Sequence, residues 1–149
     1  MNLIVTENLT KRFGTLTAVD NLSFSVNSGE IFGIVGPDGA GKTTVMRLLA
    51  SIMDPTSGKI WIDGMETAVN TETIKERVSY MSQKFGLYSD LTVRENMDFY
   101  AEIYGVRHKK KRERIEELLA FSHLTPFSER LAENLSGGMK QKLGLCCAL

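Results

Sequence analysis

One run of nine residues constrains the fold of this chain more than any other feature. It reads Gly36-Pro37-Asp38-Gly39-Ala40-Gly41-Lys42-Thr43-Thr44 and joins a short apolar segment to an amphipathic one. Its glycines let the backbone turn tightly and bring successive N–H groups against phosphate oxygens. Lys42 is a flexible cation that can reach β- and γ-phosphates, and the Thr43 hydroxyl is placed to ligate Mg²⁺. The run is therefore a candidate nucleotide-binding P-loop.

The segments on either side supply the context that such a loop needs. Glu30–Val35 is a short, nearly continuous apolar run, as expected for a strand covered on both faces. After the loop, apolar residues recur at i, i+3, i+4 and i+7, namely Val45, Leu48, Leu49 and Ile52. This spacing predicts a helix with one buried face, and its positive end would point at the bound phosphates.

The rest of the first half is rich in predicted strands. Leu3–Leu9 and Leu22–Val26 have strand composition, and alternation in the second indicates one buried face. Lys59–Asp63 alternates in the same way, and Val78–Ser82 is predicted as a short strand before Gln83. We therefore expect a β-rich region around the P-loop.

The second half is predicted to be mainly helical. Thr92 and Glu95 have the spacing of a capping box, which predicts that a helix begins at this point. The charged run His108–Arg114 leads into an apolar helix face, and its interleaved acidic residues favour a solvated surface over a binding patch. Ser136 precedes another helical pattern as an N-cap.

Composition excludes several classes of function. The chain has 149 residues, of which 42% are hydrophobic and 24% charged, so disorder is excluded. Eighteen basic and eighteen acidic residues cancel, which offers no electrostatic footprint for nucleic acid. No apolar run approaches the ~18 residues of a membrane span, and the N-terminus lacks a signal peptide pattern. Two adjacent cysteines form no disulfide framework, so a cytosolic location is the expectation.

A second glycine-rich helix start lies 94 residues after Lys42, in the run Leu135-Ser136-Gly137-Gly138-Met139. A Ser N-cap followed by two glycines leaves free N–H groups and permits close approach of an anion. One chain does not need two such sites for one nucleotide. Two chains arranged head to tail would use both sites, because each chain could close the nucleotide site of the other.

With both motifs in place, the sequence resembles the nucleotide-binding domain of ABC transporter ATPases, in their exporter-like branch. The resemblance covers the whole chain and implies an α/β fold. It implies a P-loop core with a largely parallel sheet, an antiparallel N-terminal β-subdomain and a helical subdomain. Residues 1–87 would form the β-subdomain and core, residues 88–139 the helical subdomain and residues 136–149 the signature helix.

The resemblance also implies a role for each motif residue. Phe13 would stack on adenine, with Val19 lining the same pocket, and Gly36 to Thr44 would bind the phosphates of ATP. Lys42 and Gln83 would be catalytic, and Thr43 and Gln83 would contact Mg²⁺. The signature residues Ser136, Gly137, Gly138 and Met139 would face the ATP held by a partner subunit. Asp38 and Met139 depart from the common Asn and Gln, as in exporter-like members, and neither argues against nucleotide binding.

One expected part of the family pattern is absent from this sequence. The Walker B strand, with its Mg²⁺-supporting Asp and general-base Glu, should follow the signature helix, and the sequence ends at Leu149. We therefore expect an incomplete domain that does not turn over ATP alone. Without that strand, Glu30–Val35 would have an unpaired apolar edge, so this segment alone is expected to be poorly soluble or to need a partner.

The implied partners are a transmembrane permease and a second ABC ATPase domain, with no nucleic acid. The implied location is the cytoplasmic face of a membrane, where the domain would power export. Two alternatives stay open at this point. One is an ABC protein that acts on ribosomes, and the other is a nucleotide-binding fragment without turnover. DNA-repair members are excluded because they carry a long coiled coil between the P-loop and the signature.

Overall fold

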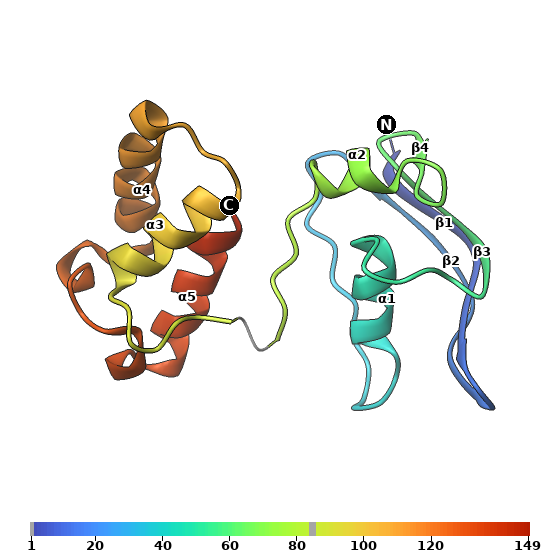
Figure 1. Ribbon diagram of the computed structural model, residues 1–149. Helices are drawn as coiled ribbons and strands as arrows, with labels where there is room; N and C mark the ends of the chain where they lie inside the picture. The colour runs from blue at the N-terminus through green and yellow to red at the C-terminus, as the bar shows by residue number, and fades with distance from the viewer. Residues whose placement is uncertain (1, 84–85) are drawn as a thin grey trace. The chain divides into compact units, whose positions relative to one another are not determined.

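A computed structural model describes residues 2–83 and 86–149 of the chain. The chain forms two compact units, Met1–Ser79 and Tyr80–Leu149. The subdomain boundary expected at residue 87 stays a prediction. Figure 1 shows strands and short helices in the first unit and only helices in the second. Each unit is described below by itself.

The first unit is built on a four-stranded sheet with the order β2-β1-β3-β4. Its strands are β1 (Asn2–Phe13), β2 (Leu16–Asn27), β3 (Ser57–Ile62) and β4 (Met65–Glu66). Gly14, with φ +58, makes the tight turn between β1 and β2. The strands predicted over Leu3–Leu9 and Leu22–Val26 are confirmed, and the one predicted over Lys59–Asp63 is formed except for Asp63, which follows β3. Every pairing in the sheet is antiparallel.

Two helices complete the first unit, α1 (Lys42–Leu49) and α2 (Thr71–Lys75). The apolar face predicted for α1 packs on the sheet and forms the core of this unit. The buried residues of this core are Leu9, Val19, Val45, Leu48, Leu49, Ile60, Ile62 and Ile74. The core therefore fixes the position of α1, and with it the end of the P-loop, against β1, β2 and β3.

Two predicted strands are not formed. Glu30–Val35 and Val78–Ser82 make no ladder hydrogen bonds within the described part of the chain, and Ile31 and Val35 are almost fully exposed. The expected parallel sheet is likewise missing among residues 2–83 and 86–149. A strand needs a neighbouring backbone to pair with, and the described residues bring none beside these segments.

Helix α1 is also shorter than its pattern predicts. Ser51 adopts the left-handed conformation, with φ +53. The Ser51 N–H then donates to the Leu48 carbonyl and the Ile52 N–H to the Arg47 carbonyl, the two bonds of a Schellman motif. This motif ends the helix, so the prediction that Ile52 belongs to the buried face is wrong, and Ile52 is 54% exposed.

The second unit is a helical bundle. It contains α3 (Val93–Ile103), α4 (His108–Ser122) and α5 (Gly137–Ala148), with single 3₁₀ turns η1 (Thr125–Phe127) and η2 (Ala132–Asn134). All three α-helices lie where the sequence predicts helices. Their apolar faces and the segment between α4 and α5 meet in a core of Val93, Met97, Ile115, Leu118, Leu119, Leu124, Ala132, Leu135, Leu143, Cys146 and Cys147. Burial raises the pKa of the Cys147 thiol to about 12.

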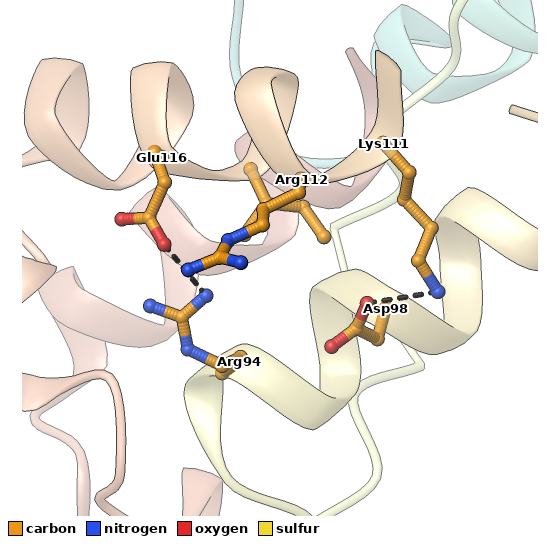
Figure 2. A pocket seen from close by; sticks show the side chains of 6 residues that line it. Arg94, Asp98, Lys111, Arg112 and Glu116 are labelled. Atoms are coloured by element: carbon orange, nitrogen blue, oxygen red, sulfur yellow. Dashed lines mark ion pairs between the residues drawn. The ribbon is translucent and has the colours of Figure 1, made fainter. Parts of the chain in front are cut away.

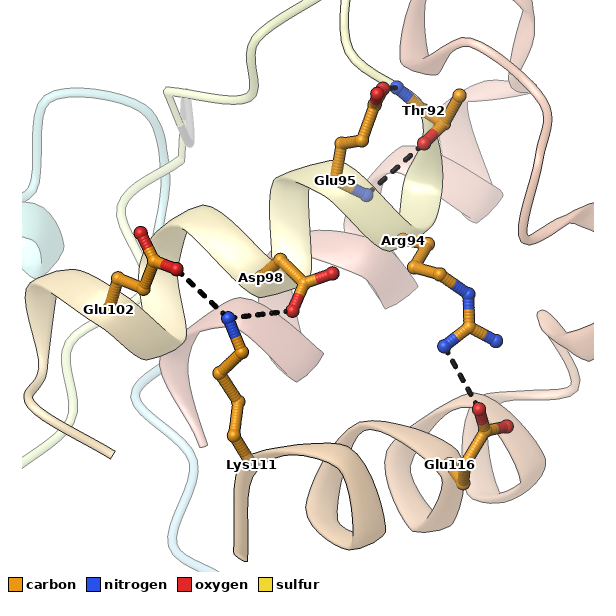
Figure 3. Close-up of polar contacts among 7 residues, drawn as sticks. All are labelled: Thr92, Arg94, Glu95, Asp98, Glu102, Lys111 and Glu116. Atoms are coloured by element: carbon orange, nitrogen blue, oxygen red, sulfur yellow. Dashed lines mark hydrogen bonds and ion pairs between the residues drawn. The ribbon is translucent and has the colours of Figure 1, made fainter. Parts of the chain in front are cut away.

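A pocket of about 530 Å³ lies between α3 and α4 and is lined mainly by charged side chains (Figure 2). Most of these charges pair across the pocket (Figure 3). Arg94 contacts Glu116 at 2.9 Å, and Lys111 contacts Asp98 at 2.9 Å and Glu102 at 3.0 Å. The hydrogen bond to Glu116 raises the pKa of Arg94, and that to Asp98 raises the pKa of Lys111. These ion pairs hold α4 against α3.

Candidate nucleotide-binding site

The P-loop of the first unit ends in a helix start that has no side-chain cap. Gly41 is the N-cap of α1, with φ +85, and it offers no side chain to the N–H groups that follow. Those groups are the orphan donors of the first turn, and they carry the positive end of the helix dipole. The start of α1 is thus a cluster of outward-pointing donors suited to an anion.

Gly41 is required for two separate reasons. A side chain at this position would be strained by the positive φ. A Cβ would also collide with the carbonyl oxygen of Ala18 on β2. The close approach of this loop to β2 therefore depends on glycine, and β2 fixes where the loop lies.

Lys42 lies over the loop itself. Its ammonium group donates to the carbonyl oxygens of Gly36 and Pro37, each at 2.7 Å. A lysine ammonium has three N–H donors, so a third stays available for a phosphate oxygen. The Thr43 side chain is exposed in the first turn of α1, and Asp38 is exposed in the loop. The loop therefore gathers a cation, a hydroxyl and backbone donors.

The two residues expected at the adenine pocket differ in their exposure. Phe13, the last residue of β1, is 47% exposed and presents aromatic surface. Val19 is only 6% exposed because its side chain belongs to the core of the first unit. Phe13 can therefore offer a ring to a ligand, whereas Val19 acts mainly through packing.

Gln83 belongs to the second unit and is exposed. Residues 84 and 85, which follow it, lie outside the described residues. The segment beyond them is held by Asn96, which is fully buried in α3. The Asn96 side chain accepts from the Tyr88 N–H at 2.9 Å and donates to the carbonyls of Tyr88 and Thr92, at 3.0 and 2.9 Å.

Sequence reasoning did not identify Asn96. A buried amide is costly unless its hydrogen bonds are made, and Asn96 makes them with the backbone of the loop before α3. A signal was present, because a polar residue stood beside Met97 on the apolar side of the predicted helix. Its partners are backbone atoms, however, and the sequence does not reveal them.

Helix α5, the predicted signature helix, begins where the sequence predicts. Ser136 is the N-cap, and its hydroxyl accepts from the Met139 N–H at 3.4 Å, a long contact. Gly137 and Gly138 are exposed, and a Cβ on either would meet no atom within 4 Å. Met139 is half-buried against the core, which explains why an apolar residue fits this position. The helix start is therefore open to its surroundings.

The described residues contain neither a cluster of three or more metal-ligating His, Cys, Asp or Glu side chains nor a helix long and apolar enough to cross a membrane.

Comparison with known proteins decides the family. The family model described as "ABC transporter" matches residues 19–149, which include the P-loop, Gln83 and the signature. The chain belongs to the ABC transporter ATP-binding family. This assignment confirms the family and fold class expected from the motifs.

Relatives within this family serve different transporters. The chain is 46% identical over 149 residues to the "Probable multidrug ABC transporter ATP-binding protein YbhF" of Escherichia coli (strain K12), covering 99% of the chain and 26% of that protein. It is 36% identical over 146 residues to the "Probable sulfate/thiosulfate import ATP-binding protein CysA" of Chlorella vulgaris, covering 98% and 61%. The chain thus spans less than two thirds of the length of these relatives.

A solved structure of an ABC cassette has the same fold. The dimeric post-hydrolysis state of the ATP-binding cassette MJ0796, bound to ADP and Pi, aligns with a TM-score of 0.82 and 26% identity. The alignment covers 98% of this chain and 68% of that chain.

The structure places the predicted site residues on two units. Phe13, Val19 and the P-loop lie in the first unit, and of these Val19 belongs to its core. Gln83 and the signature residues lie in the second unit.

Proposed function

We propose that this chain binds MgATP through its P-loop and belongs to the ATP-binding subunit of an ABC transporter that exports its substrate. The observation that carries the proposal is the start of α1, where Gly41 leaves the first-turn N–H groups uncapped beside Lys42. That arrangement suits the β- and γ-phosphates of a nucleotide.

The roles of the individual residues follow from their chemistry. Residues 36–44 bind the phosphates, with Lys42 as the cation that neutralises charge in the transition state. Phe13 stacks on adenine. The Thr43 hydroxyl and the Gln83 side chain supply oxygen atoms, the donor type that Mg²⁺ prefers, so these residues fit the ion. Bound Mg²⁺ would neutralise charge on the phosphates.

The signature helix supports a second ATP-binding domain as partner. Gly137 and Gly138 leave the start of α5 open, and Ser136 adds a hydroxyl beside it. An open helix start binds phosphate by the same physics as the P-loop. We propose that it contacts ATP held by the other subunit of a dimer.

A membrane permease is the proposed partner of the second unit. Tyr88, Ile103 and Tyr104 are exposed apolar or aromatic residues before, at the end of and just after α3, and Tyr104 is 64% exposed. Aromatic residues are enriched in protein interfaces. This surface lies in the same unit as Gln83, and binding there would place the protein on the cytoplasmic face of the membrane.

Export is proposed because the relative named for multidrug transport shares 46% identity, against 36% for the relative named for sulfate/thiosulfate import. Cells that carry Lys42→Ala should then become more sensitive to toxic organic compounds. A growth defect that one added nutrient corrects would instead indicate import.

The partner is tested by affinity purification of the full-length protein from detergent-solubilised membranes. We expect a protein with several membrane-spanning helices to co-purify with the wild type and to be lost when Tyr104 is changed to Glu. Lys75→Ala, which alters an exposed side chain of α2, is the matched control and should retain it. Co-purification of ribosomal proteins in place of a membrane protein would contradict the proposal.

A further inference from the structure

The exposed ring of Phe13 is not alone at the end of β1. The ammonium group of Lys11, two residues earlier in the strand, lies over this ring at 5.3 Å from its centroid. The same ammonium donates to the carbonyl oxygen of Asp54 at 2.6 Å. A cation within about 6 Å of an aromatic face is attracted by the negative charge of that face. Lys11 therefore links the ring to the segment that follows α1.

This segment is itself fastened to β1. The Thr56 N–H donates to the Thr10 carbonyl at 2.8 Å, and the Arg12 N–H donates to the Thr56 hydroxyl at 3.0 Å. Together with the bond from Lys11 to Asp54, three hydrogen bonds hold residues 54–56 beside the end of β1. The acceptor of the Lys11 ammonium is therefore a backbone carbonyl, that of Asp54, in a segment that is itself bonded to β1.

We propose that Lys11 is a positioning residue for the purine base of the nucleotide, an inference that rests on the proposed role of Phe13. The Lys11 ammonium lies over one face of the Phe13 ring, and the proposal puts the base on the opposite face. The base then completes a stack in which the aromatic ring lies between the ammonium and the purine. The cation holds the ring in place and draws electron density from it, which favours stacking on an electron-rich base.

This arrangement lets an experiment distinguish binding of the base from binding of the phosphates. Lys11 acts through an aromatic ring, so its effect requires a ligand that carries a base. A ligand with the same phosphate charge and no base should be insensitive to it. Tripolyphosphate with Mg²⁺ is such a probe, since it can occupy the P-loop without contacting Phe13.

The experiment compares binding of MgATP and Mg-tripolyphosphate to the full-length protein by calorimetric titration. Lys11→Met keeps an unbranched side chain, one atom shorter than that of lysine, and removes its charge. We expect it to weaken MgATP binding about fivefold and to leave Mg-tripolyphosphate binding unchanged. Lys11→Arg should restore MgATP affinity, because a guanidinium group can also lie over the ring. Tripolyphosphate binding reports at the same time that the P-loop remains folded.

Two controls separate positioning from simple charge. Arg12→Met removes the neighbouring positive charge, and it should affect both ligands equally or neither. In a Phe13→Leu background, Lys11→Met should have no further effect on MgATP affinity. The inference is overturned if Lys11→Met weakens both ligands alike, weakens neither, or acts equally in both backgrounds. A wild-type protein that binds no MgATP would overturn the proposed function as well, so the two failures are distinguishable.

Discussion

The two glycine-rich helix starts of this chain resemble each other in sequence and differ in structure. At α1, Gly41 has a positive φ and its Cα lies against the Ala18 carbonyl, with no side-chain cap. At α5, Ser136 supplies a cap, and Gly137 and Gly138 lie in open space. The glycine of the first start is in close contact with its own unit, whereas a Cβ on either glycine of the second start would meet no atom within 4 Å.

This difference indicates why each set of glycines is present. Gly41 is needed by the fold, because any other residue would be strained and would collide with β2. The fold of the second unit makes no such demand on Gly137 or Gly138. If these two glycines are needed, the need arises from a molecule that approaches the start of α5 closely, as the proposed partner nucleotide would.

The largest expected effect comes from Gly41→Ala. The left-handed backbone and the Ala18 carbonyl both oppose a Cβ, so we expect the free energy of unfolding of the first unit to fall by more than about 2 kcal/mol. MgATP binding should be lost with it. Denaturant unfolding and calorimetric titration measure the two effects. A variant with wild-type stability and affinity would contradict the claim that the first unit requires glycine at position 41.

Gly138→Ala should separate function from stability. Its Cβ meets no atom, so we expect the free energy of unfolding to change by about 0.5 kcal/mol or less. ATP-driven dimerisation should weaken roughly tenfold, since a methyl group would obstruct the approach of phosphate to the helix start. Analytical ultracentrifugation with and without ATP measures the association. Unchanged dimerisation would remove the proposed role of this glycine.

The strengths of the helix caps provide a smaller test. Thr92 accepts from the Glu95 N–H at 3.1 Å and Glu95 accepts from the Thr92 N–H at 2.8 Å, whereas the Ser136 contact is 3.4 Å long. Thr92→Ala should therefore cost about 1 kcal/mol of stability, and Ser136→Ala about half as much. Urea titration of both variants gives the order. The reverse order would show that Ser136 is a stronger cap than its geometry indicates.

The smallest expected effect concerns pH. The Thr92 N–H, which donates to the Glu95 carboxylate, lowers the pKa of Glu95 from its ordinary value of 4.5. The stability from this group is therefore present above pH 4.5 and is lost as pH falls through the lowered value. Glu95→Gln should flatten the acid limb of a stability profile. Ser136→Ala should not, because the first turn of α5 has no acidic residue.

Features that depend on nearby residues could be predicted from the sequence. The P-loop, the box of Thr92 and Glu95, and the N-cap at Ser136 each arise from residues within a few positions of one another. Helix faces such as Val45 and Leu48 were predicted because their spacing alone places them together. For these features, local chemistry determines local structure.

Features that depend on distant backbone could not be predicted in this way. Glu30–Val35 has strand composition, yet a strand exists only where another segment pairs with it. The partners of Asn96 are backbone atoms of an irregular loop, and the contact of Lys11 with Asp54 joins residues 43 positions apart. Ile52 follows the helical spacing of α1, but the left-handed Ser51 places it outside the buried face.

The central claim is that the uncapped start of α1, with Lys42, binds the phosphates of MgATP. The most direct test is calorimetric titration of the full-length protein with MgATP, comparing the wild type with Lys42→Ala and with the control Lys75→Ala. We predict saturable binding by the wild type and the control, and a loss of roughly tenfold to a hundredfold in affinity for Lys42→Ala. Equal affinity in all three proteins would contradict the claim.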